Sequence, residues 1–230
     1  MLKQKYCKKL DTKRDINLDV KIDHIRLNDL PEIARLYEDV FADHFLGHMG
    51  QKFLKLFCSQ FVNSSTNYGY VAKCNGKSVG FLLGSIDDAP FYQFYRQNFA
   101  ALALIVVKQY LTDTYVRKHI AKRFGNILAA IKTLFSSPTR GISANHYNTF
   151  VPARLLAIGV QSNYRGIGIA NKLTSRFCTQ MEREGFKKVA LSTLPWNERA
   201  IHFYRKDGWI QEDSSEASLN FIRIIKPASF

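Results

Sequence analysis

Apolar positions along the 230-residue chain recur at strand or helix spacing, and this spacing predicts an ordered series of elements. Residues 20–27, VKIDHIRL, alternate apolar and polar as a half-buried strand does, and residues 28–41 continue with a helical pattern. A second helical pattern covers about 49–62. The dipeptide Asn75-Gly76 then separates two apolar runs, which is a strong signal for a β-hairpin. This part of the chain therefore predicts strand, helix, helix and hairpin.

The pattern changes over about 87–138, where helical stretches continue until Ser136-Ser137-Pro138. We interpret this region as a two-helix insertion. Its first helix is rich in aromatic and aliphatic residues. It could form a homodimer face, a lid over a substrate or a membrane-surface helix, or it could simply pack against other helices. The pattern alone leaves these alternatives open.

The last third of the chain has the most regular pattern. Residues 153–160, ARLLAIGV, predict a buried strand, residues 168–184 a helix and residues 187–194 another strand. Such a unit implies two parallel strands with the connecting turn at the carboxyl end of the first, where open α/β sheets bind ligands. A short helix ending at Gly208 follows, with two further strands near 209–213 and 218–225.

Closely spaced glycines precede the helix at 168–184, in the stretch YRGIGIANKL at 164–173. The N–H groups of such a turn, together with the dipole of the following helix, suit an anion. The dinucleotide-binding pattern G-x-G-x-x-G would need Gly or Ala where the chain has Asn171, and the P-loop would need Gly-Lys-Ser/Thr. Neither of these phosphate motifs fits, so the pattern leaves the anion open.

The composition narrows the classes of protein and partner. The net charge of +14 suits nucleic acid, an anionic membrane or phosphorylated molecules, but the basic residues are spread out without interleaved aromatics, so the nucleic-acid signal is weak. Four scattered cysteines indicate neither a metal site nor disulfides. The longest apolar run, 99–107, is too short to span a membrane. We expect a basic arm over 1–19 and one domain over 20–230, in a cytoplasmic protein.

Two blocks of sequence resemble the GCN5-related N-acetyltransferase (GNAT) superfamily. Arg165-x-x-Gly168-x-Ala170 matches the signature R/Q-x-x-G-x-G/A, whose turn holds the pyrophosphate of acetyl-CoA in that superfamily. PWNERAIHFYRKDGW, at 195–209, is similar to a later motif, N-x-x-A-x-x-F-Y-x-x-x-G-F/W. The resemblance covers about 20–213 except the insertion. It implies an α/β GNAT fold, with a mixed central sheet flanked by helices and a helical insertion.

The resemblance also implies a reaction: direct transfer of acetyl from acetyl-CoA to a primary amine through a tetrahedral oxyanion, without a metal. It implies an oxyanion donor in the backbone N–H of Val160 and a general acid in Tyr204, whose phenol has an ordinary pKa of about 10. The cofactor contacts that it implies are Ile158, Gly159, Val160, Arg165, Gly166, Ile167, Gly168, Ile169, Ala170, Asn197, Ala200 and Phe203. From the residues alone, Tyr204 could instead be a packed aromatic and Asn197 only a helix N-cap.

The general base and the amine acceptor stay open at this point. Strand 153–160 carries no carboxylate, where many family members have one, and Asp43, His44 and His146 lie in loops that could reach the site. A water chain is the alternative. The insertion resembles that of acetyltransferases in surface-polysaccharide and amino-sugar pathways, and the basic charge favours an anionic nucleotide-linked amino sugar as acceptor. Other amino sugars, protein N-termini, lysines and small amines stay open. The alternative function is a non-catalytic CoA-binding or nucleic-acid-binding module on this scaffold.

Overall fold

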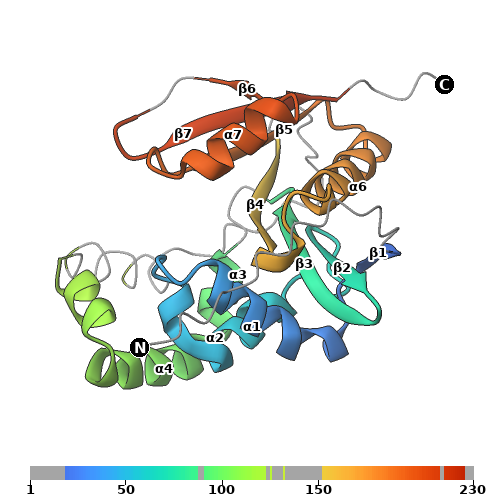
Figure 1. The fold of residues 1–230 in the computed structure, drawn as a ribbon. Coiled ribbons are helices and arrows are strands. Elements are labelled where there is room, and N and C mark those ends of the chain that lie inside the picture. The colour runs from blue at the N-terminus through green and yellow to red at the C-terminus, as the bar shows by residue number, and fades with distance from the viewer. Residues whose placement is uncertain are drawn as a thin grey trace, which may run out of the picture.

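A mixed β-sheet runs through the computed structural model, which describes residues 19–87, 91–122, 125, 132, 152–212 and 215–225 (Figure 1). In this part of the chain seven strands lie in the order β1-β2-β3-β4-β5-β7-β6. Their bounds are β1 Val20–His24, β2 Asn67–Cys74, β3 Lys77–Ser85, β4 Ala153–Val160, β5 Lys188–Thr193, β6 Ile210–Gln211 and β7 Leu219–Ile224. Only β4 and β5 pair in parallel among these strands.

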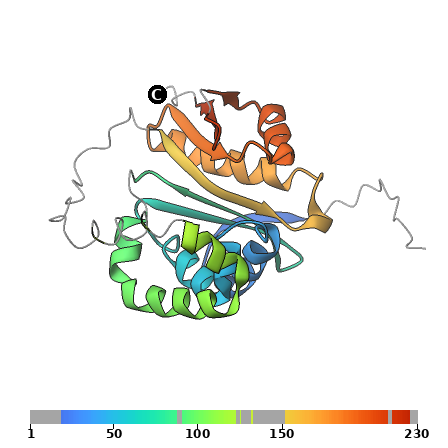
Figure 2. The same ribbon diagram turned by 90° about the vertical axis from the view of Figure 1, so that its left-hand side faces the viewer.

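Helices cover both faces of the sheet (Figure 2). On one face lie α1 Leu30–Val40 and α2 Gly50–Ser59, and on the other lie α6 Ile169–Arg183 and α7 Glu198–Lys206. A hydrophobic core lies on each face of the sheet, because successive side chains of a strand point to opposite faces. On β3, Leu82 packs on the α6 side and Phe81 on the α1 side. This α/β arrangement confirms the expected mixed sheet flanked by helices.

The hairpin lies where the sequence predicts it, between β2 and β3. Asn75 and Gly76 both have positive φ, at 50° and 78°. This is the backbone of a two-residue turn whose twist matches the twist of the strands.

β4 and β5 separate after two residue pairs, Ala153 with Val189 and Arg154 with Ala190. Beyond that point β4 stays paired with β3 as far as Val160, and β5 pairs with β7. The β3–β4 register shifts between Leu83 and Gly84, so that Leu156 is an extra residue on β4. A bulge of this kind bends its strand and increases its twist. The edge of β4 that faces β5 is therefore open along its second half.

The insertion differs in detail from its prediction, because three helical segments are described where two helices were expected: α3 Tyr92–Gln97, α4 Phe99–Thr112 and Thr114–Lys122. Asn98 ends α3 with a side-chain bond to the carbonyl of Phe94 (2.9 Å), and Asp113 caps the third segment through the N–H groups of Tyr115 and Val116. The end of the predicted insertion, most of the basic arm and His146 lie outside the described residues.

In the described part of the chain, no single helix is long and apolar enough to cross a membrane. Taken together, α4 and Thr114–Lys122 have the length and composition of a membrane-spanning helix, but the chain bends by 113° between them.

Candidate active site

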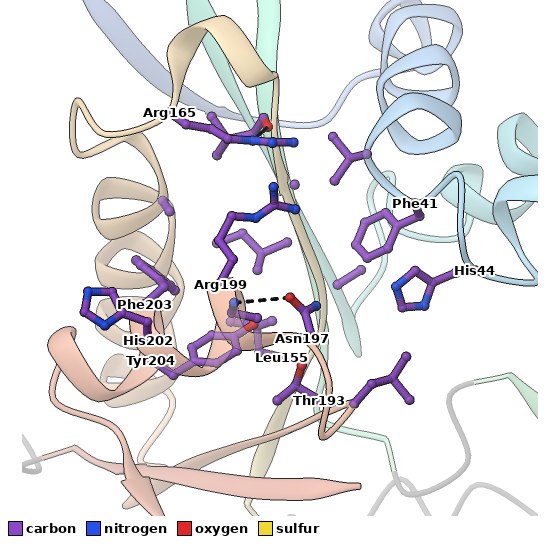
Figure 3. Close-up of a pocket in the computed structure, with 18 of the residues that line it drawn as sticks. Phe41, His44, Leu155, Arg165, Thr193, Asn197, Arg199, His202, Phe203 and Tyr204 are labelled. Atoms are coloured by element: carbon purple, nitrogen blue, oxygen red, sulfur yellow. Dashed lines mark hydrogen bonds between the residues drawn. The ribbon is translucent and has the colours of Figure 1, made fainter. Parts of the chain in front are cut away.

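A cavity of about 1150 Å³ lies where β4 and β5 separate (Figure 3). Its walls come from the end of α1 and the following loop, the β4 edge, the turn before α6, the end of β5, and α7. Every site residue predicted from the sequence lines it except Ile167, which is exposed on the turn. The structure thus brings together two sequence blocks that are about 30 residues apart.

The β4 edge presents backbone groups to this cavity. The N–H of Gln161 donates to Val79 on β3 (2.9 Å), so the alternation of a strand turns the N–H and C=O of Val160 toward the opposite, open edge. Arg165 Nε donates to that carbonyl (3.0 Å). Gly159 is required by packing, because a Cβ there would lie 2.8 Å from the ring of Phe81.

The glycine turn has a backbone conformation that residues with a side chain rarely adopt. Gly166 and Gly168 have φ values of 83° and 82°, in the left-handed region, and a Cβ on either would meet no protein atom within 4 Å. The first backbone bond of α6 runs from the N–H of Lys172 to Gly168 (3.0 Å). The preceding N–H groups have no intrahelical acceptor, and they lie at the positive end of the helix dipole. The turn therefore has the features of an anion site.

A second arginine joins Arg165 at the cavity. Arg199, in the first turn of α7, lines the cavity, and Figure 3 shows both side chains directed into it. Burial, and then the neighbouring charge of Arg199, lower the pKa of Arg165. Two guanidinium groups so placed favour a ligand with more than one negative charge. Arg199 was not predicted as a site residue, because an arginine in the first turn of a short helix has the pattern of a solvent-facing residue.

Tyr204 is buried at 5% exposure, and its ring packs against Trp209 and Phe221 with ring centroids 5.7 Å apart in each case. Burial raises the pKa of Tyr204 well above its ordinary value, so the phenol stays protonated at neutral pH. The side chain nevertheless lines the cavity and reaches it from α7 (Figure 3). Tyr204 is thus both a packed aromatic and a group accessible from the cavity.

Asn197 caps α7, because its Oδ1 accepts from the N–H of Ala200 (3.2 Å; Figure 3). This fixes the first turn of the helix that carries Arg199 and Tyr204. Asn197 also lines the cavity. The capping role that the sequence left open is therefore present.

A buried carboxylate connects α7 to the helix that follows the glycine turn. Asp207 accepts from Arg223 (2.9 Å), Trp209 Nε1 (3.0 Å) and Thr174 (3.1 Å), and also from Asn171 (2.6 Å). Asn171, which excluded the dinucleotide-binding motif, therefore holds α6 against the end of α7.

The opposite wall of the cavity is formed by the loop after α1, with Phe41, Asp43, His44 and Phe45. Burial lowers the pKa of His44 despite the nearby Asp43, so its imidazole is neutral at pH 7 and can accept a proton. The insertion supports this loop, since His119 stacks on Phe45 at 4.6 Å. Among the described residues, no group of three or more His, Cys, Asp or Glu side chains could hold a metal ion.

The fold is that of an α/β protein with a cavity beside a split sheet, and part of the chain matches a known family. Residues 142–209, which span β4 to the end of α7, match the family model of the acetyltransferase (GNAT) family. The matched segment contains both sequence motifs, and over this segment the chain is similar to the GNAT acetyltransferases. No protein of curated function matches it by sequence.

Solved structures are similar to this chain at the level of the fold. The chain resembles the PaiA N-acetyltransferase of Thermoplasma acidophilum in complex with coenzyme A (11% identity, TM-score 0.53, covering 90% of this chain and 99% of that one). It also resembles the ribosomal-protein-S18-alanine N-acetyltransferase of Escherichia coli (13% identity, TM-score 0.53, covering 91% of this chain and 96% of that one). A third similar structure is the GNAT domain of S. lividans PAT (13% identity, TM-score 0.54, covering 89% of this chain and 90% of that one). At these identities the likeness shows the GNAT fold.

Proposed function

We propose that this protein is an acetyltransferase that binds acetyl-CoA in the cavity between β4 and β5 and transfers the acetyl group directly to a primary amine. The observation that carries the proposal is one continuous cavity that joins the glycine turn, the open edge of β4 and Tyr204. A diphosphate, an extended amide chain and a thioester need such features in that order.

The residues at the turn fit the diphosphate of coenzyme A. Space lies open beside Gly166 and Gly168, unpaired N–H groups begin α6, and Arg165 and Arg199 add positive charge. The PaiA structure, which has the same fold, contains coenzyme A. The open backbone edge of β4 would pair with the amide groups of the pantetheine arm, as a neighbouring strand does.

Bound acetyl-CoA supplies a thioester carbonyl for attack by the amine. A carbon–nitrogen bond forms and the carbon–sulfur bond breaks. The N–H of Val160 is proposed to donate to the negative charge that develops on the carbonyl oxygen, and the phenol of Tyr204 to give its proton to the departing thiolate. His44 is our candidate to take the proton of the amine, because it lines the same cavity and burial favours its neutral form.

The walls of the cavity support a particular kind of acceptor. Arg165, Arg199 and Lys206 line it together with Asp43, its only lining carboxylate in the described part of the chain. Positive charge in excess disfavours polycationic amines and favours an anionic carrier of the amine. The aromatic rings of the loop after α1 suit a sugar or base ring. We therefore propose a nucleotide-linked amino sugar as the first acceptor class to test.

The setting and the alternative function are also proposals. Cys58, Cys74 and Cys178 are buried free thiols, which suits a reducing compartment such as the cytoplasm. A CoA-binding or nucleic-acid-binding module without catalysis is the alternative, and the presence of Tyr204 at the cavity favours catalysis.

Release of free thiol from acetyl-CoA tests the proposal directly. Purified protein is incubated with nucleotide-linked amino sugars, free amino sugars, amino acids, peptides and polyamines. We expect release with an amine of the first class at a rate well above hydrolysis. Tight acetyl-CoA binding without release on any acceptor would favour the binding module, and steeply salt-dependent binding to DNA or RNA would favour the nucleic-acid alternative.

A further inference from the structure

The outer face of α4 is apolar, although it lies at the surface of the molecule farthest from α6 and α7 (Figure 2). Leu104, Val107 and Leu111 are 74%, 58% and 68% exposed. Their spacing of three and four residues places them along one side of the helix, and we call them the apolar stripe. Other exposed residues on that side of the helix are Ala100, Ala101 and Lys108.

α4 differs from an ordinary surface helix because it carries apolar side chains on its outer side as well as on its inner side. Gln109 faces inward, where its side-chain nitrogen donates to the backbone carbonyl of His48 (2.7 Å). Leu102 also faces inward and packs in the core with α1 and α2. Because the inner side of α4 already packs in the core, the exposed Leu104, Val107 and Leu111 form a second apolar area that the described residues do not cover.

Basic residues outnumber acidic residues in the segment that carries the apolar stripe. From residue 91 to residue 122 the chain has five lysines and arginines, and its one acidic residue, Asp113, is bonded to His48 (2.8 Å). Arg117 donates to the carbonyls of Tyr110 and Leu111 at the end of α4, which holds its guanidinium beside the stripe. Lys108 and Lys118 are exposed on α4 and on the next helical segment.

We propose that α4 and Thr114–Lys122 dock this protein on an anionic lipid surface, with the apolar stripe inserted among the acyl chains. Leucines bordered by lysine, arginine and a half-exposed Tyr110 are the combination that binds at a charged bilayer interface. A second copy of this chain is a poorer occupant, because it would bring the same positive charges to the same face. This proposal is independent of the proposed acetyl transfer.

Co-sedimentation with lipid vesicles tests the proposal. Wild-type protein is compared with Leu104→Gln/Val107→Gln and with a matched control, Ile210→Gln/Ile224→Gln, which changes residues 53% and 61% exposed on β6 and β7. We expect wild type and control to bind vesicles of phosphatidylglycerol and phosphatidylcholine. The double change on α4 should weaken binding by more than about tenfold, because each leucine or valine buried in lipid contributes at least that order of affinity. Pure phosphatidylcholine and high salt should weaken it as well.

Other occupants would give different results, each of which overturns the proposal. Absence of wild-type protein from the vesicle pellet excludes a lipid surface, and equal binding by wild type and the α4 variant excludes the apolar stripe as the docking site. A wild-type dimer that only the α4 change converts to monomer identifies a second copy as the partner. A melting temperature that falls in the α4 variant and not in the control indicates that the stripe is covered by this chain itself.

Discussion

Replacing Gly168 with alanine should separate ligand binding from folding at the glycine turn. Gly168 has φ of 82° and ψ of 7°, and the added methyl group would meet no protein atom within 4 Å. In the folded protein the methyl group therefore costs backbone strain and no steric clash. With acetyl-CoA bound, it would occupy space that the diphosphate needs.

The two costs can be estimated separately. A left-handed alanine costs about 1–2 kcal/mol, and about 0.4–1 kcal/mol of this is offset because the unfolded chain loses freedom. The net loss of roughly 1 kcal/mol should lower the melting temperature by about 2–4 °C in a chain of this length. A methyl group against the diphosphate should cost acetyl-CoA more than about 1.4 kcal/mol, or tenfold in Kd.

Gly185→Ala is the matched control, because Gly185 has φ of 83° and open space around its Cβ, and it follows the other end of α6. That end is about 22 Å from the turn for a 15-residue helix. Calorimetric titration with acetyl-CoA and thermal melts of both variants complete the assay. Both should lose similar stability, and only Gly168→Ala should lose affinity. Equal acetyl-CoA affinity in the two variants would refute the assignment of the turn.

Three further changes test the remaining residues. Tyr204→Phe should lower kcat by about 10²–10⁴-fold without changing acetyl-CoA affinity, and unchanged kcat across pH would remove its role as acid. His44→Gln should abolish an acid limb of kcat/KM that lies below pH 6.5, because the neutral imidazole is lost as pH falls through its lowered pKa; an unaltered pH profile would exclude His44 as base. Asp207→Asn should destabilise by roughly 1–3 kcal/mol in chemical denaturation, since Arg223 loses its charged partner, and an unchanged unfolding midpoint would contradict that estimate.

Local patterns predicted the elements around the turn closely. The strand at 153–160 coincides with β4, and the helix predicted from 168 begins one residue later because Gly168 adopts the left-handed conformation that precedes it. These elements depend on spacing within short segments, which the sequence contains in full. The division of the insertion was predicted less well, because Asn98 and Asp113 act through individual side-chain bonds that spacing does not reveal.

The separation of β4 and β5 could not be predicted in the same way. It depends on where two distant segments stop pairing and on the extra residue Leu156, which is set by the match of β4 to β3. The position of Arg199 beside Arg165 could not be predicted for the same reason, because it follows from the packing of α7 near the turn. Contacts between distant segments thus account for most of what the sequence analysis missed.

The two sides of the cavity differ in how much they depend on contacts between distant segments. This difference explains why an acyl donor can be proposed from the sequence more readily than an acceptor. The proposed donor side is made from β4, the turn and the start of α6, which are consecutive in sequence and present backbone groups through a local pattern of glycines. The proposed acceptor side is made from the loop after α1, and the position of this loop depends on contacts such as the stacking of His119 on Phe45. A change in the insertion can therefore reshape the acceptor wall while the glycine turn stays intact. Acceptor specificity should accordingly follow the pairing of this loop with the insertion more closely than it follows the motif residues.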